Sequence, residues 1–523
     1  MKNTKIFSLL AVLIFTSVIL SSCAKDWLDV DPIGKTVSEN YYSNEEEIGM
    51  GLIAVYDFLH SDHLNDWSSP FIIKLLPSDD SNCGGGNAGD QLPYQQIDKF
   101  DWSPLNPRIE TLYQICYLGI HRANKVINHN AETETDLIKR HIAEAKLLRA
   151  YYYLDLVISF GGVPISPEES LSPDSPLPRE SKETIFQMIV SDLQDAAAGL
   201  PNKSEYSSAD RFRASKQTAL GLLVKAHVFN QNWGSAVSAF EELVAFEGAE
   251  VDLDPDFGQM FRIEGEFGIE SLLEASFKST QRAWDGWGQG WSRDGNDNDN
   301  RHIQLMNPRG DQGFEPGTSG MREGWGFIPP TDKIEQAFEP GDGRKLHTVL
   351  SFDEFRELFS FENEEGDSVF AGIANPGHDV ENSIRMKYAA WASETIDPDE
   401  GAAETEFSTN WRLLRYADVL LLAAEAYARN GNDGAARTQL NKVRNRAGLP
   451  DYEGSDLLDK IKHERFVELA FEGQRYWDLV RWGVAAQELG SRFVANKHEF
   501  FPIPQVAINN NPGLTQADQN PGY

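Results

Sequence analysis

The sequence predicts a mainly α-helical fold, in which helix hairpins form a scaffold and one long irregular region lies between them. Apolar residues recur at helical spacing over long stretches between residues 105 and 246. Residues 416–447 read as a helix hairpin whose small and large side chains follow a tetratricopeptide-like spacing. Residues 250–410 are crowded with Gly, Pro, Asn and Asp and hold few long periodic runs. That composition predicts loops, short strands and a few short helices.

The first 22 residues are typical of a secretory leader. Lys2 and Lys5 precede a nearly uninterrupted apolar run over residues 6–20, which is shorter than the roughly 20 residues that span a bilayer. The run ends in Leu-Ser-Ser-Cys, which resembles a lipobox, so Cys23 is the expected lipid attachment site. Several acyl chains at about 0.8 kcal/mol per buried methylene would anchor a large body firmly. The alternative is an ordinary signal peptide followed by a stray cysteine.

The composition of the body limits its partners. The formal charge of the whole chain is -34, and removing the leader takes away two lysines. A surface this acidic repels nucleic acid and anionic lipid head groups. Besides Cys23, the chain has only Cys83 and Cys116, which could pair or remain free thiols.

The helices are expected in the following order. After an extended tether over residues 23–45, residues 105–128 and 135–160 carry the clearest periodicity, and Gly161, Gly162 and Pro164 end the second. Residues 181–200 predict another helix, and residues 216–246 predict a hairpin joined near residues 230–233. Helix is expected to resume at Arg412. We therefore divide the chain into a leader (1–22), anchor and tether (23–45), an N-terminal helical region (46–250) and a C-terminal region (251–523) that includes a loop-rich, ligand-binding segment (251–410).

Several sequence blocks together resemble one known family. They are the lipobox followed by Trp27-Leu-Asp and Pro32; residues 145–157 (AKLLRAYYYLDLV) with 160–164 (FGGVP); residues 415–426 and 440–449; residues 464–473 with 475–483 (RYWDLVRWG); and residues 501–504 (FPIP), 511–512 and 519–523. These blocks span the mature chain and are similar to those of the SusD/RagB nutrient-binding lipoproteins. The irregular segment 251–410 matches that family only in general character.

The resemblance implies a SusD-like fold, a place on the outer membrane and a partner. Members of the family act as a hinged lid on a SusC-like TonB-dependent transporter and capture oligosaccharides, or in some cases peptides, at the cell surface. We therefore expect a binding protein that needs no cofactor and is not an enzyme. The alternatives are a peptide-binding member of the family, a glycoside hydrolase, and a repeat protein that only holds partners together.

Glycine-flanked tryptophans are the leading candidates for the ligand site. Trp284, Trp287 and Trp291 stand in the stretch WDGWGQGW, where glycines allow the backbone to present flat rings outward. Indole faces stack on the apolar faces of sugar rings, while neighbouring polar groups bind the hydroxyls. The alternative is that these rings bury against the scaffold. Trp325 and Trp67 are weaker candidates of the same kind.

Two polar loops were considered as sites. Residues 79–87, which include Asp80, could line the ligand site, and their glycines lack the context of a phosphate-binding loop. Residues 294–300 (DGNDNDN) resemble a calcium loop in composition but lack the glycine and glutamate of an EF-hand. An acidic, flexible loop is the preferred interpretation, and no metal is expected.

Charged residues crowd the block from residue 464 to 481. Glu464, Glu468 and Glu472 recur every four residues, so a helix would place them on one face. Two of them could serve as acid and base in glycoside cleavage. We favour a structural role, in which they pair with nearby arginines such as Arg475 and Arg481, because apolar and aromatic residues interleave the charges. The sequence holds no HExxH and no Gly-x-Ser-x-Gly motif.

Overall fold

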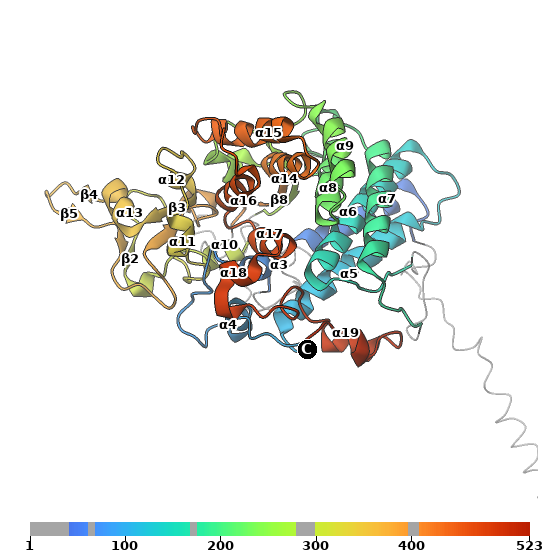
Figure 1. The fold of residues 1–523 in the computed structure, drawn as a ribbon, viewed down its shortest axis with the longest axis horizontal. Coiled ribbons are helices and arrows are strands. Elements are labelled where there is room, and N and C mark those ends of the chain that lie inside the picture. Colours follow the sequence, from blue (N-terminus) through green and yellow to red (C-terminus); the bar gives the residue numbers. More distant parts are fainter. Residues whose placement is uncertain (1–40, 61–67, 168–174, 279–298, 396–406) are drawn as a thin grey trace, which may run out of the picture.

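The computed structural model describes residues 41–60, 68–167, 175–278, 299–395 and 407–523. The first of its three regions is helical. Its helices are α2 (Glu45–Tyr56), α3 (Pro70–Leu75), α4 (Leu92–Asp98), α5 (Pro107–Ile127), α6 (Asp136–Phe160), α7 (Lys182–Gly199), α8 (Lys216–Phe229) and α9 (Trp233–Val244). In Figure 1, α5, α6, α7 and α8 stand side by side at one end of the molecule.

The local sequence explains where these helices begin and end. The Thr135 side chain accepts the Ile138 N–H and caps α6, and Ser181 caps α7 through the Thr184 N–H. Gly161 ends α6 at a φ of 74°, a left-handed value that favours glycine. The helices predicted over residues 105–128, 135–160, 181–200 and 216–246 are thereby confirmed, with the hairpin turn between Phe229 and Trp233.

The middle region consists of short elements, as the composition predicts. They are β1 (Ser271–Ala275), α10 (His302–Leu305), β2 (Phe314–Glu315), α11 (Asp332–Glu335), α12 (Lys345–Thr348), β3 (Val349–Ser351), α13 (Phe352–Phe359), β4 (Phe361–Glu362), β5 (Ser368–Val369), β6 (Gly372–Ile373) and β7 (Ser383–Arg385). Antiparallel pairs join β2 to β6, β3 to β7 and β4 to β5. These pairs and α13 form a lobe that projects to the left in Figure 1.

The C-terminal region returns to helix and packs against the first region. Its elements are β8 (Trp411–Arg415), α14 (Tyr416–Arg429), α15 (Asp433–Arg446), α16 (Leu457–Glu468), α17 (Arg475–Trp482), α18 (Ala485–Leu489) and α19 (Gln505–Asn510). The hairpin of α14 and α15 is confirmed, and α14 lies against α8 and α9. The expected helix start at Arg412 is wrong, because residues 411–415 form strand β8 and the helix begins at Tyr416.

One large hydrophobic core runs through the molecule, and a smaller one fills the lobe. The large core includes Ile48 and Ile508, near the two ends of the described chain, and the second is built around Phe355. Cys83 and Cys116 are buried free thiols. In the described part of the chain, no helix is both long and apolar enough to cross a membrane. The mainly α-helical fold with a loop-rich region is thus confirmed.

Candidate functional site

The antiparallel pair of β1 and β8 leads to a place where distant stretches of chain meet. Ala275 pairs with Trp411, and just beyond it the Asn410 side chain accepts the Phe277 N–H at 2.7 Å. Phe277 stands one residue before the end of the described stretch 175–278, and Asn410 stands near the start of the stretch 407–523. This contact therefore fixes the chain where it enters residues 279–298 and where it leaves residues 396–406.

The other ends of the same two segments are tied to this place. The Asn300 N–H donates to the Phe407 carbonyl at 2.8 Å, and its side-chain amide donates to the Thr409 carbonyl at 2.7 Å. The Thr409 hydroxyl donates to Glu394 at 2.5 Å. Asn300 opens the stretch after residue 298, and Glu394 nearly closes the one before residue 396. All four ends of the two segments thus lie within one hydrogen-bonded group.

An aromatic cluster supports this place and adds a third segment end. The Phe277 ring lies 5.0 Å from the His60 ring, and His60 ends the described stretch before residues 61–67. Phe277 also contacts the buried Trp411 edge to face, and Trp411 stacks on Phe71 with ring centroids 4.0 Å apart. The ends of segments 61–67, 279–298 and 396–406 therefore share one aromatic base.

Most of the predicted ligand-binding tryptophans stand in these segments. Trp67, Trp284, Trp287 and Trp291 lie outside the described residues, as do Cys23 and most of the acidic loop 294–300. The structure brings together the described ends of the segments that carry all four tryptophans. The sequence gave no sign that residue 60 and residue 277 would meet.

Trp325 is half-buried at the edge of the large core. The Arg309 guanidinium lies 5.9 Å from the centre of its ring, and the adjoining Phe327 forms a bridge with Gly84. A partly exposed indole beside a cation still suits a ligand contact, so Trp325 stays a candidate.

Asp80 lies inside the molecule and not in a surface loop. Its side chain is 1% exposed, and its carboxylate accepts the Phe471 N–H at 3.1 Å and the Ser81 hydroxyl at 3.3 Å. Burial raises the pKa of Asp80, against the hydrogen bonds that lower it. The preceding Asp79 forms a two-bonded ion pair with Arg475, at 2.6 and 2.8 Å. These contacts join the loop to the C-terminal helices, which corrects the expectation that Asp80 faces a ligand.

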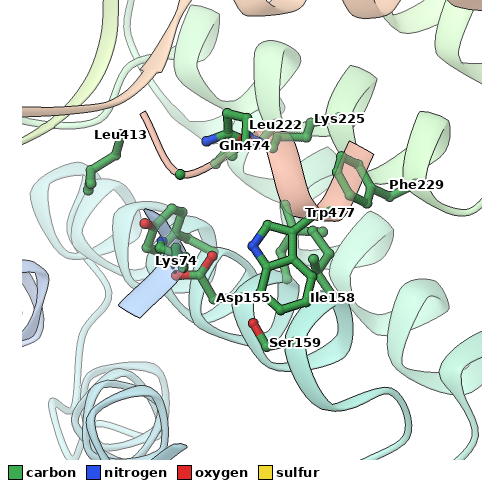
Figure 2. A pocket seen from close by; sticks show the side chains of 13 residues that line it. Lys74, Asp155, Ile158, Ser159, Leu222, Lys225, Phe229, Leu413, Gln474 and Trp477 are labelled. Carbon is green, nitrogen blue, oxygen red and sulfur yellow. Dashed lines mark hydrogen bonds and ion pairs between the residues drawn. The ribbon is translucent and has the colours of Figure 1, made fainter. Parts of the chain in front are cut away.

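Two enclosed cavities beneath β8 are too small for a sugar. The first, shown in Figure 2, has a volume of about 30 Å3 and lies between α6, α8 and α17 beside Trp477 and the Lys74–Asp155 ion pair. The second has about 20 Å3 and shares Lys74 and Asp155. A cavity of roughly this size holds one or two water molecules, whereas ligand pockets take up about 300 Å3 or more.

A larger groove of about 1040 Å3 lies among α7, α8 and α9. Its floor includes Leu220 and Leu223, its walls carry small residues such as Ala197 and Ser235, and Phe246 is its one aromatic side chain. Its volume could admit a ligand. However, it lacks the exposed indole faces that carry sugar stacking, so we do not choose it as the glycan site.

The C-terminal glutamates are structural, as favoured from the sequence. Glu468 is fully buried and contacts Arg344 at 2.8 Å, Arg415 at 2.6 Å and Arg446 at 2.5 Å. Burial alone would raise the pKa of Glu468, but the three guanidinium groups hold it well below its usual value. A carboxylate saturated in this way cannot deliver or accept a catalytic proton at neutral pH.

The choice of partners for these glutamates differs from the sequence-based interpretation. Glu464 pairs with Arg344 and Arg444, and Glu472 pairs with Arg415 and Lys387, all distant in sequence. The arginines within the block bind elsewhere: Arg475 binds Asp79, and Arg481 binds Glu425 and Asp478. Helix α16 ends at Glu468, so Glu472 lies in the following turn and not on the same helix face.

Comparison with known proteins places this geometry in a family. Residues 360–523 match the model of the SusD family, and residues 26–227 match a model described as "Starch-binding associating with outer membrane". Among curated proteins, the chain is 25% identical to SusD-like protein P2 of Formosa agariphila, over 95% of this chain and 96% of that protein. It is 22% identical to the starch-binding protein SusD of Bacteroides thetaiotaomicron, over 82% and 81% of the two chains.

Solved structures extend the likeness to the fold. A laminarin-binding SusD-like protein superposes with a TM-score of 0.80 at 28% identity, over 92% of this chain and all of that one. Surface glycan-binding protein A of Bacteroides thetaiotaomicron, solved with laminarihexaose, gives 0.75 at 26% identity over 91% and 99%. The two family models together match more than two thirds of the sequence, at its two ends and in the order expected from its motifs. The chain belongs to the SusD/RagB family.

Proposed function

We propose that this protein is a surface lipoprotein of the outer membrane that captures an oligosaccharide and passes it to a SusC-like TonB-dependent transporter. The observation that carries the proposal is the convergence of three segment ends at His60, Phe277 and Asn410. The segments that leave this place hold Trp67, Trp284, Trp287 and Trp291. Four indoles tethered to one aromatic base suit the stacking of several consecutive sugar rings.

A β-glucan is the first ligand to test. Two structures that superpose over more than nine tenths of this chain are titled as binding laminarin or laminarihexaose. A relative titled as starch-binding is more distant at 22% identity. Laminarin therefore ranks ahead of starch as a ligand.

The binding experiment uses the acylation-free body, residues 24–523, in isothermal titration with laminarin, starch and a peptide mixture. We expect saturable binding of one glycan and none of the peptides. Alanine at Trp284 or Trp287 should weaken that binding by roughly 1–3 kcal/mol, the cost of losing an aromatic anchor. Saturable binding of a peptide alone would leave the family role in place and overturn the glycan.

Catalysis is tested in the same samples. We expect no new reducing ends after long incubation with the bound glycan, because binding alone is proposed. Reducing ends that increase with protein concentration would favour the glycoside hydrolase alternative. Absence of saturable binding to any glycan or peptide would favour the repeat-scaffold alternative.

A further inference from the structure

Asn410 uses every one of its polar groups in the hydrogen-bonded group beneath the segment ends. Its side-chain oxygen accepts the Phe277 N–H at 2.7 Å, and its side-chain amide donates to Glu274 at 2.8 Å. Its backbone N–H donates to Glu266 and its carbonyl accepts from Arg412, each at 2.8 Å. The residue is 1% exposed, so water does not compete for these bonds.

The chemistry of the surroundings requires an amide at this position. Phe277 offers an N–H that can only donate, and Glu274 offers a buried carboxylate that accepts. Only a side chain with an acceptor on one branch and a donor on the other satisfies both. A carboxylate at residue 410 would place a second anion 2.8 Å from Glu274, and an apolar residue would leave both partners unpaired in the interior.

Charge makes the requirement stricter. Three buried carboxylates, those of Glu266, Glu274 and Glu394, surround the start of β8, and Arg262 and Arg412 face them. Three acidic groups against two cations leave no spare positive charge among these five residues. A further anion at residue 410 would therefore be expelled, together with the backbone at Phe277 that the amide now holds.

We propose that Asn410 is a positioning residue for ligand binding, because it fixes the chain at Phe277, from which the tryptophan-bearing segment departs, against the strand pair of β1 and β8. The role rests on the proposed function. Asn410 itself is buried and acts through the backbone that it holds. Asn300 completes the arrangement by tying the far end of the same segment to Phe407 and Thr409.

A reciprocal exchange tests this role. Asn410→Asp puts a carboxylate against Glu274 and should weaken glycan binding by about tenfold or more. Adding Glu274→Gln restores the pattern with donor and acceptor exchanged: the new amide donates to the new carboxylate, and its oxygen still accepts the Phe267 N–H, now at 2.8 Å from Glu274. The double variant has the same net charge as the wild type. Its affinity should return to within about threefold of the wild-type value.

A matched control separates positioning from stability. Asn520 is also buried and donates its amide to the Phe160 and Phe501 carbonyls, at 2.9 and 2.6 Å, in a different part of the molecule. Asn520→Asp should lower the melting temperature while the folded protein binds the glycan with unchanged affinity. Affinity is measured by titration at a temperature where circular dichroism shows each variant folded.

The outcomes are distinct. Unchanged affinity in folded Asn410→Asp overturns the positioning role, and so does a double variant that recovers the melting temperature but not the affinity. If Asn410→Asp does not fold, the double variant alone decides, since it keeps the hydrogen bonds and the charge. A wild-type protein that binds no glycan overturns the proposed function and this role with it, whereas wild-type binding with unchanged Asn410→Asp affinity overturns the role alone.

Discussion

Glu468→Gln should destabilise the protein without altering its ligand. Glu468 is fully buried and shares its two carboxylate oxygens among Arg344, Arg415 and Arg446. Glutamine keeps one acceptor oxygen but turns an amide donor toward a guanidinium, and it removes the negative charge. Removing one member of a buried ion pair costs about 3–5 kcal/mol.

The structure indicates a cost at the lower end of that range. Arg344 keeps Asp342 and Glu464, and Arg415 and Arg446 keep Glu270. We therefore expect a loss of about 3 kcal/mol in the free energy of unfolding. The described chain of about 440 residues unfolds with an entropy near 0.9 kcal/mol/K, so the melting temperature should fall by about 3 °C.

Thermal melts and urea titrations measure this loss, and pH gives a second readout. The folded-state pKa of Glu468 is depressed, so its contribution is present above the unfolded pKa and is lost as pH falls toward the folded value. The stability difference between wild type and Glu468→Gln should therefore shrink in acid. Glu362→Gln, at an exposed strand residue, is the control and should stay within about 0.5 kcal/mol of wild type. A Glu468→Gln protein that melts with the wild type, or a difference that grows in acid, would refute this account of the ion network.

Three further predictions concern anchoring, the core and pH. Cys23→Ala should move the protein from the membrane fraction to the soluble fraction, and recovery in membranes at the wild-type level would contradict lipid attachment. Trp477→Ala should cost about 3–5 kcal/mol in stability, because the ring is 4% exposed and packs edge to face on Phe501, and the folded remainder should bind with unchanged affinity. Selective loss of binding in a stable Trp477→Ala protein would place this ring in the ligand site. Burial, offset in part by Arg412, raises the pKa of Glu266 to about 8, so its stabilising contribution is full below its unfolded pKa and is lost as pH rises through about 8. Glu266→Gln should therefore gain stability relative to wild type as pH rises from 5 to 9 in urea titrations, and a constant difference over that range would show that Glu266 is already ionised.

The helices could be predicted because their signals are local. Caps at Thr135 and Ser181 and the break at Gly161 stand within a few residues of the helix ends that they define. Strand β8 could not be predicted in the same way. The sequence of residues 411–415 (WRLLR) runs directly into α14, and what makes it a strand is pairing with β1, about 140 residues earlier. Pairing over that distance leaves no local pattern in a single sequence.

The site was partly accessible for the same reason. The glycine-flanked tryptophans are visible as composition, but the meeting of His60, Phe277 and Asn410 depends on long-range contacts. Asp80 was misjudged because it stands among polar and glycine residues that are typical of a surface loop. Its burial depends on Phe471, almost 400 residues later.

Long-range ion pairs also explain how a loop-rich region can hold a ligand site in place. Segment 251–410 has few regular elements, yet Glu270, Arg344 and Lys387 each reach a buried partner in the C-terminal region. Such contacts fix isolated points of an irregular chain to a helical frame, while the sequence between those points stays free to vary. Changes of ligand within this fold should therefore arise between the fixed points and leave the charged partners unchanged. Exchanging residues 279–298 for the corresponding segment of a relative with a different glycan should move the specificity with the segment and leave the melting temperature within a few degrees, whereas the same exchange extended through Asn300 should also lower stability because it breaks the bonds to Phe407 and Thr409.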